Sequence, residues 1–263
     1  MSKFLSADRY QPDMEFTFNN SAQYQSNQRV LASLVGLVAI GMPAMMLIFG
    51  HSDGCVRYSI SHHYYTRFLG TIFVGSLAFI SAFLISYRGT HPRENVYATI
   101  AGVGAFFVAI FPTNGTGCPD GQIQARLFAS VMSPDPSAPQ APVNGAFFDL
   151  FATAPILHYG SAAIVFLFLA WYCLVVFTRP VLGVSADEGT LKLTNAKRTR
   201  NTIYYVCGGI IVLSILAMVI FGRSDWWNPA RGTLIAETAS LWAFGVSWIV
   251  KGRLFGFVFN DVS

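Results

Sequence analysis

The chain has 263 residues, of which 53% are hydrophobic and 11% charged, and its formal net charge is +4. The charged share is less than half of that in a typical soluble domain, so the composition excludes an ordinary soluble fold. The small positive charge has a simpler cause than nucleic-acid binding, because it follows from basic links beside a membrane.

The apolar residues fall into six runs, each long enough to cross the roughly 30 Å hydrocarbon core of a bilayer as a helix. The runs lie near residues 30–50, 67–87, 96–112, 156–178, 202–222 and 233–250. Backbone polar groups in lipid must be satisfied within the element, so six transmembrane helices are expected. The predicted fold is therefore all-α, a polytopic six-helix bundle.

The chain is predicted to form one transmembrane domain with polar ends. Residues 1–28 are polar and contain no apolar core followed by a small-residue cleavage site, so the first span should act as an uncleaved anchor. The six-helix domain covers residues 29–255, with residues 113–154 as an insertion. Residues 256–263 form a short C-terminal tail.

A polar segment, SISHHYYTR at residues 59–67, separates the first two spans. If this segment were helical, Ser59, His63 and Arg67 would share one face at four-residue steps. The Ser-Ile-Ser portion could instead be extended and cap the helix that follows.

The link at residues 113–154 is far longer than a helix–helix connection requires, and long links are often functional or disordered. Its middle, SPDPSAPQAPV, is rich in proline and cannot form regular helix or sheet. Its end, GAFFDLFATAP, is apolar but too short to span the bilayer. We expect this end either to lie in the membrane interface or to fold over the outer face of the bundle as a cap.

Basic residues are distributed unequally between the links, which predicts the orientation of the chain. With a cytoplasmic N-terminus, twelve lie inside: Lys3, Arg9, Arg29, Arg88, Arg93, Arg179, Lys192, Lys197, Arg198, Arg200, Lys251 and Arg253. Five lie outside: Arg57, Arg67, Arg126, Arg223 and Arg231. Both termini are then cytoplasmic, in the inner membrane of a bacterium. The run KRTRN, which ends the link 179–201, is expected to be a solvated loop beside anionic headgroups.

The four cysteines form two pairs with different expected roles. Cys173 and Cys207 fall inside spans, where small apolar packing residues are expected. Cys55 and Cys118 both fall in outer links, on the oxidising side of the membrane. We predict that they form a disulfide.

Three outer span ends carry polar residues that could form one site. Glu237 is the only carboxylate well inside a span, and a charge there costs several kcal/mol unless it is paired or faces water. His158 opens the fourth span at the same depth, and Ser161 lies one turn deeper. Glu237 is therefore a functional-site candidate, and the structural alternative is a bond to Arg67 or His63 that fastens two helices.

Part of this group suits a divalent metal. His62 or His63, together with His158 and Glu237, would hold zinc with one position open for water. Water on such a zinc is acidic enough to attack an ester or amide. The spans contain no close H-x-x-x-H spacing, which weighs against the metal.

Three segments, SISHHYYT, AFFVAIFPT and ETASLWAFGVSWIVKG, carry a resemblance that covers most of the chain. Together they resemble a family of uncharacterised six-span bacterial membrane proteins with a SISxxYYT signature, a resemblance that implies the fold and no activity.

The chain is also similar to the alkaline ceramidase and adiponectin-receptor superfamily. This similarity rests on Ser59 or Ser61 together with His62 or His63. That similarity implies a lipid amidase with a zinc held by three histidines. The chain departs from the pattern in its last span, where Glu237 stands in place of paired histidines, and it has no seventh span.

Two functions follow from the sequence. In the first, an outward-facing polar pocket binds a lipid-like or amphipathic ligand and hydrolyses it with a metal; Glu237 and His158 act in catalysis. The ligand-binding residues would be Ser59, Ser61, Tyr65, Arg67 and Ser161. In the second, the chain is a non-catalytic accessory subunit of a larger membrane complex. Membrane lipids or other membrane subunits are the expected partners, and nucleic acid is not.

Overall fold

The computed structural model describes residues 22–52, 56–89, 91–111, 113, 154–180 and 192–254. Every regular element within these residues is helical. The elements are α1 (Ala22–Ser52), the 3-10 helix η3 (Ser61–Tyr65), α2 (Arg67–Ser86), α3 (Pro92–Ile110), α4 (Ala154–Trp171), the π-helical turn η6 (Tyr172–Val176), α5 (Asn195–Phe221) and α6 (Gly232–Gly252).

Five segments are long and apolar enough to cross a membrane. They are Asn27–His51, Phe68–Ser86, Ala154–Val176, Asn195–Phe221 and Gly232–Gly252. The chain thus has the character of a multi-pass helical membrane protein. The remaining predicted span, 96–112, is helical up to Ile110, but α3 begins with the polar sequence PREN, which lowers its mean hydropathy.

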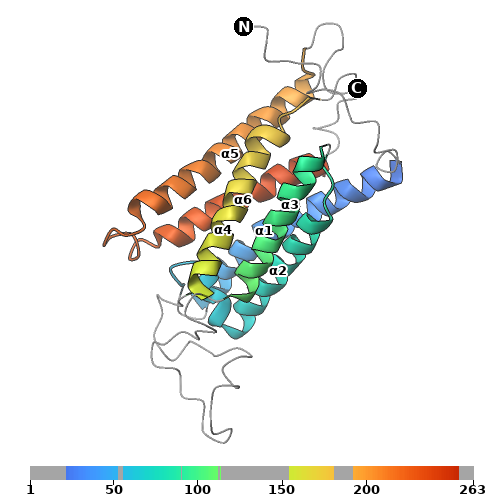
Figure 1. The fold of residues 1–263 in the computed structure, drawn as a ribbon. Coiled ribbons are helices and arrows are strands. Elements are labelled where there is room, and N and C mark those ends of the chain that lie inside the picture. Colours follow the sequence, from blue (N-terminus) through green and yellow to red (C-terminus); the bar gives the residue numbers. More distant parts are fainter. Residues whose placement is uncertain are drawn as a thin grey trace, which may run out of the picture.

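The six long helices form a ring in chain order (Figure 1). Each helix packs on the next along the chain, and α6 closes the ring by packing on α1, the most extensive contact of the bundle. Neighbours in sequence are therefore neighbours in space, as short links between antiparallel helices favour. The helix ends of this ring gather at the two opposite ends of the bundle.

The two ends of the bundle are named by the residues that meet there. At the SISHH end, residues 56–66 and Phe111 meet the first turns of α4 and α6. At the Glu94 end, the start of α3 meets Arg179, which follows η6. The start of α1 and the end of α6 also meet there, since a side chain on Gly252 would clash with Arg29 and Ser33.

Glycines allow the close contact between α1 and α6. A Cβ atom on Gly36 would lie 2.6 Å from the carbonyl oxygen of Gly245, and one on Gly245 would lie 2.6 Å from that of Gly36. Real Cβ atoms do not approach backbone this closely, so any side chain would push the two helices apart. Small residues let helix backbones approach closely, and Gly36 and Gly245 have that role at this contact.

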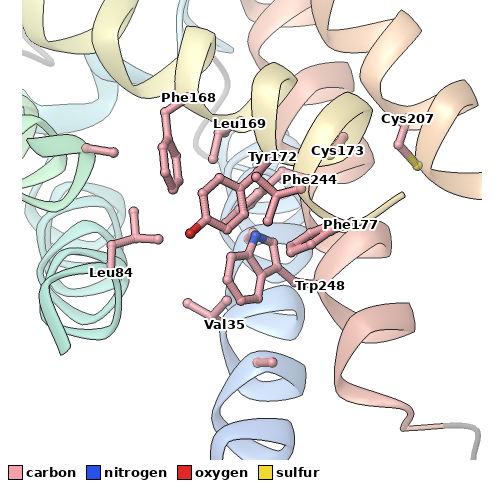
Figure 2. Close-up of a cluster of buried hydrophobic side chains, with 14 of the residues drawn as sticks. Val35, Leu84, Phe168, Leu169, Tyr172, Cys173, Phe177, Cys207, Phe244 and Trp248 are labelled. Atoms are coloured by element: carbon pink, nitrogen blue, oxygen red, sulfur yellow. The ribbon is translucent and has the colours of Figure 1, made fainter. Parts of the chain in front are cut away.

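The core nearer the Glu94 end is aromatic (Figure 2). Trp248 is fully buried, and its ring lies 4.9 Å from that of Phe83 and 5.1 Å from that of Phe177, both edge to face. Tyr172 stacks on it at 6.0 Å. Such aromatic pairs contribute about 0.5–1.5 kcal/mol each beyond burial. Residues from α2, η6 and α6 are thereby held in one cluster.

Cys173 and Cys207 are free and buried in this core, as expected of packing residues. The Cys173 thiol lies 3.2 Å from the Ser247 hydroxyl. The predicted disulfide partners, Cys55 and Cys118, lie outside the described residues, and so do the N-terminal tail up to Ser21, the proposed cap in the long link and the C-terminal tail.

The basic run KRTRN is helical, so its prediction as a solvated loop was wrong. It forms the first turns of α5, and the hydroxyl of Thr194 caps that helix by accepting a hydrogen bond from the Lys197 backbone N–H at 3.2 Å. The Lys197 ammonium is buried and donates to the Phe177 carbonyl at 2.7 Å. The Phe177 carbonyl, which follows η6, therefore binds the Lys197 ammonium that was expected to face headgroups.

Candidate functional site

The segment SISHHYYTR folds as a short 3-10 helix followed by a break. η3 ends at Thr66, whose backbone is extended (φ −94°, ψ 147°) and whose hydroxyl accepts a hydrogen bond from Gly70 N–H at 3.1 Å. This capping starts α2 at Arg67. The break separates Arg67 from the preceding turn, so the predicted helical face shared by Ser59, His63 and Arg67 does not form.

Residues 56–60 are fixed against the first turns of α6. The Leu234 backbone N–H donates to the Tyr58 carbonyl at 2.9 Å, and the Arg231 guanidinium donates to the Val56 carbonyl at 3.1 Å. The first bond satisfies a backbone N–H that a helix start leaves unpaired, and the second ties the Arg231 side chain to the segment. They bring the segment within reach of the next turn of α6, where Glu237 lies.

Glu237 accepts hydrogen bonds from the segment itself. Its carboxylate lies 2.7 Å from the Ile60 backbone N–H and 2.8 and 2.9 Å from the Ser59 hydroxyl. Donors of this kind are what a carboxylate in lipid requires to offset its lost hydration. A serine and a backbone amide thus occupy the place in which Arg67 or His63 was expected.

His158 bridges the segment to the end of α3. Its Nδ1 lies 2.7 Å from the Phe111 carbonyl oxygen, and its Nε2 lies 3.0 Å from the Ser61 hydroxyl. A carbonyl only accepts, so Nδ1 carries the proton and the neutral ring presents Nε2 as an acceptor. The Ser61 hydroxyl then donates to Nε2.

These contacts form one continuous network. The Ser61 backbone N–H donates to the Ser59 hydroxyl oxygen at 3.2 Å, which connects the Glu237 bonds to the His158 bonds. His158 is 2% exposed and Ser61 7% exposed. The structure therefore brings together Ser59, Ser61, His158 and Glu237 from the residues predicted for the site.

The other predicted residues have different surroundings. His63 is buried, and its Nδ1 lies 3.2 Å from the Ser59 carbonyl oxygen, within its own turn. Ser161 is buried where α4 packs on Gly104 of α3. His62 is half-buried. The side chains of Tyr65 and Arg67 lie outside the described part of the structure.

The residues at the SISHH end do not fit zinc. Among the described residues, no three His, Cys, Asp or Glu side chains are grouped as a metal site requires. Both ring nitrogens of His158 and both carboxylate oxygens of Glu237 already face hydrogen-bond partners.

Arg57 was assigned to an exposed outer link, but the structure buries it at 1% exposure. Burial lowers the pKa of its guanidinium, because desolvation disfavours the charged form. The sequence offered no signal for this, since Arg57 stands in a polar stretch beside Ser59.

A second candidate site lies at the Glu94 end, which the sequence had not indicated. It is a groove between α3, α4 and α5 with a volume of about 1340 Å³. Its apolar lining includes Tyr97, Ile100, Ile164, Leu167, Trp171, Val175 and Tyr205. Its polar lining includes His91, Arg93, Glu94, Thr178 and Arg179. The groove is thus apolar along its length and charged at its mouth.

Two contacts shape this groove. The Arg179 guanidinium forms an ion pair with the buried Glu94 carboxylate, which joins the start of α3 to the residues after η6. The rings of Tyr97 and Trp171 meet edge to face at 5.1 Å across α3 and α4. The ion pair lies at the charged mouth, and the two rings form part of the apolar lining.

No protein-family model, curated protein or solved structure matches this chain. The two family resemblances stay predictions from the sequence.

Proposed function

We propose that this protein binds a membrane phospholipid with an anionic headgroup in the groove at the Glu94 end. The observation that supports this is one cavity with a long apolar lining and a charged mouth. Its volume of about 1340 Å³ exceeds the roughly 300–1,000 Å³ of pockets for drug-sized ligands. A lipid has the matching size and the matching division into apolar and charged parts.

The apolar lining suits acyl chains that enter from the side. Ile100, Leu167 and Tyr205 expose 47%, 59% and 54% of their surfaces, so the groove is open along the bundle rather than sealed within it. Such side chains face hydrocarbon in a membrane-spanning bundle. An acyl chain lying along them would cover exposed apolar surface on three helices.

The charged mouth suits a phosphate. Arg93 is exposed at the start of α3, and Arg179 keeps about a quarter of its side chain exposed while it pairs with Glu94. A guanidinium presents several N–H donors in a fork that matches phosphate oxygens. Because Glu94 neutralises Arg179, Arg93 is the cation we assign to the headgroup.

The proposed orientation places this mouth at the cytoplasmic surface. Six spans, α3 included, with both termini inside would put the Glu94 end on the side of the basic links in a bacterial inner membrane. Cytoplasmic leaflets rich in anionic lipid attract such basic segments. Binding at the SISHH end and the accessory-subunit role stay predictions of the sequence.

The test is native mass spectrometry of protein purified in mild detergent and then mixed with phosphatidylglycerol or phosphatidylcholine. We expect preferential binding of phosphatidylglycerol. Arg93→Gln should weaken it by roughly tenfold, because a hydrogen bond to a charged group contributes about 1.5 kcal/mol and 1.4 kcal/mol is a factor of ten. Leu167→Trp should block the groove for both lipids.

Two controls decide the outcome. Arg198→Gln changes an exposed cation at the same end outside the groove, and Val30→Trp enlarges an exposed apolar residue on α1. Neither variant should alter the binding of phosphatidylglycerol or phosphatidylcholine. Equal binding of both lipids, or equal losses in the groove and control variants, would contradict a specific site.

A further inference from the structure

We propose that Ser61 and His158 form a nucleophile–base pair that hydrolyses acyl esters or amides of amphipathic substrates at the SISHH end. The proposal does not depend on the lipid groove at the other end. It rests on the geometry of the pair, in which the Ser61 hydroxyl lies 3.0 Å from Nε2 of His158.

The pair has the three parts of an activated serine. A nucleophile and a base lie within hydrogen-bond reach, and a third group orients the base. Here the third group is the Phe111 carbonyl, 2.7 Å from Nδ1 of His158. It fixes the tautomer in which Nε2 is free of a proton, the role that a carboxylate has in a Ser-His-Asp triad.

The backbone carrying Ser61 is held by Glu237. The carboxylate accepts from Ser59 and Ile60, and the Ser59 hydroxyl accepts from the Ser61 N–H. A nucleophile displaced by about 1 Å loses much of its advantage, so this network matters for rate as well as for stability. We assign Glu237 as a positioning residue rather than a base.

The surroundings indicate an amphipathic substrate. Ile60, Tyr64, Leu69 and Leu234 belong to a buried hydrophobic cluster at this end of the bundle. α2 and α6, which begin here, are apolar enough to span a membrane. The proposed substrate is therefore an ester or amide with one apolar side, which would approach Ser61 from the membrane boundary.

The reaction needs only water as a second reactant. The Ser61 oxygen attacks the acyl carbon while His158 Nε2 takes the hydroxyl proton, giving a tetrahedral oxyanion. The carbon–heteroatom bond then breaks, and His158 returns the proton to the departing alcohol or amine. Water attacks the acyl-serine with His158 as base, which releases the acid and restores Ser61.

The decisive experiment is covalent labelling of the full chain in detergent with diisopropyl fluorophosphate, a probe small enough for a serine that is 7% exposed. Peptide mapping of the wild-type protein should find one adduct, on Ser61. Its rate should rise with pH as the imidazole loses its proton. His158→Gln should slow labelling by about 100-fold or more, the usual contribution of a general base.

Matched variants separate chemistry from packing. Ser81→Ala removes another buried serine, on α2, and should label like the wild type. Ser61→Cys keeps a nucleophile beside the base, so it should lose the phosphoryl adduct and react with iodoacetamide faster than Cys173. Wild-type protein that stays folded without an adduct on Ser61, while a known serine hydrolase is labelled alongside, would overturn the proposal. So would a labelling rate independent of His158.

Discussion

Glu237 shows how a half-buried carboxylate in a span is held by neutral donors among the described residues. Its described partners are a hydroxyl and a backbone amide of the segment before η3. The depth of Glu237 made it a candidate, but its partners could not be read from the sequence. Donors on an irregular segment ahead of a helix follow no helical spacing, and any residue except proline supplies a backbone N–H.

We predict graded losses of stability for replacements of Glu237. Glu237→Gln keeps one oxygen for both the Ile60 N–H and the Ser59 hydroxyl, but it replaces bonds to a charged carboxylate by weaker bonds to a neutral amide, so it should cost about 1 kcal/mol. Glu237→Leu leaves two donors unpaired, and each costs about 1–3 kcal/mol. Thermal unfolding in detergent measures both.

The double variant Glu237→Leu/Ser59→Ala is the control, because it removes the hydroxyl that the leucine would leave unpaired. It should regain only part of the lost stability, because the Ser61 backbone N–H then loses the Ser59 oxygen as its acceptor. A Glu237→Leu protein as stable as the wild type would show that the network is not a fastening element. The rate of Ser61 labelling in Glu237→Gln then reports positioning independently of stability.

At the scale of elements, the sequence located the helices well and their ends less well. The predicted runs 67–87 and 233–250 agree with α2 and α6 within two residues. The prediction for the first helix began eight residues late, because α1 extends back through the polar sequence AQYQSNQR. Hydropathy detects only the part of a helix that lies in lipid.

The two sites differ in how far sequence could predict them. Ser59, Ser61, His158 and Glu237 stood out because polar residues are costly at span ends. The groove did not stand out, because its lining joins ordinary apolar residues of α3 and α4 with Tyr205 of α5. Which faces meet depends on packing between helices, and the spacing within one helix does not encode it.

The close contact between α1 and α6 predicts how two glycine-to-alanine replacements change the stability of the bundle. Gly36→Ala should destabilise the bundle by about 1–3 kcal/mol, the usual cost of overpacking, because the new methyl meets backbone at 2.6 Å. Gly41→Ala, on the same helix, is the matched control. A Cβ there has no atom within 4 Å, and alanine is favoured over glycine in a helix by roughly 0.5–1 kcal/mol.

Thermal unfolding of both variants measures the difference. Gly36→Ala should unfold at a lower temperature than the wild type, and Gly41→Ala at the same or a higher temperature. Equal midpoints for the two variants would mean that α1 and α6 are less closely packed than the structure has them.

At the scale of the whole molecule, the ring places two different sites at opposite ends. Ser61 and His158 lie where α2, α4 and α6 begin, and the charged mouth of the groove lies where α3 begins. Because α6 packs on α1, the ring is closed, and the helix ends that carry the two sites are held in place. If the proposals hold, acyl chemistry and lipid binding are on opposite membrane surfaces.

Which site faces which membrane surface depends on the orientation of the chain, and the distribution of basic residues predicts that orientation. A reporter fused after Ser263 should be active only in its cytoplasmic form, because basic residues gather at the Glu94 end and an even number of spans returns the chain there. A reporter fused after Ser224, between α5 and α6, should be active only in its periplasmic form. One fused after Gln140, in the long link, tests α3 separately. Periplasmic activity there makes α3 a sixth span, whereas cytoplasmic activity would remove α3 from the membrane-crossing helices and reassign every link before it.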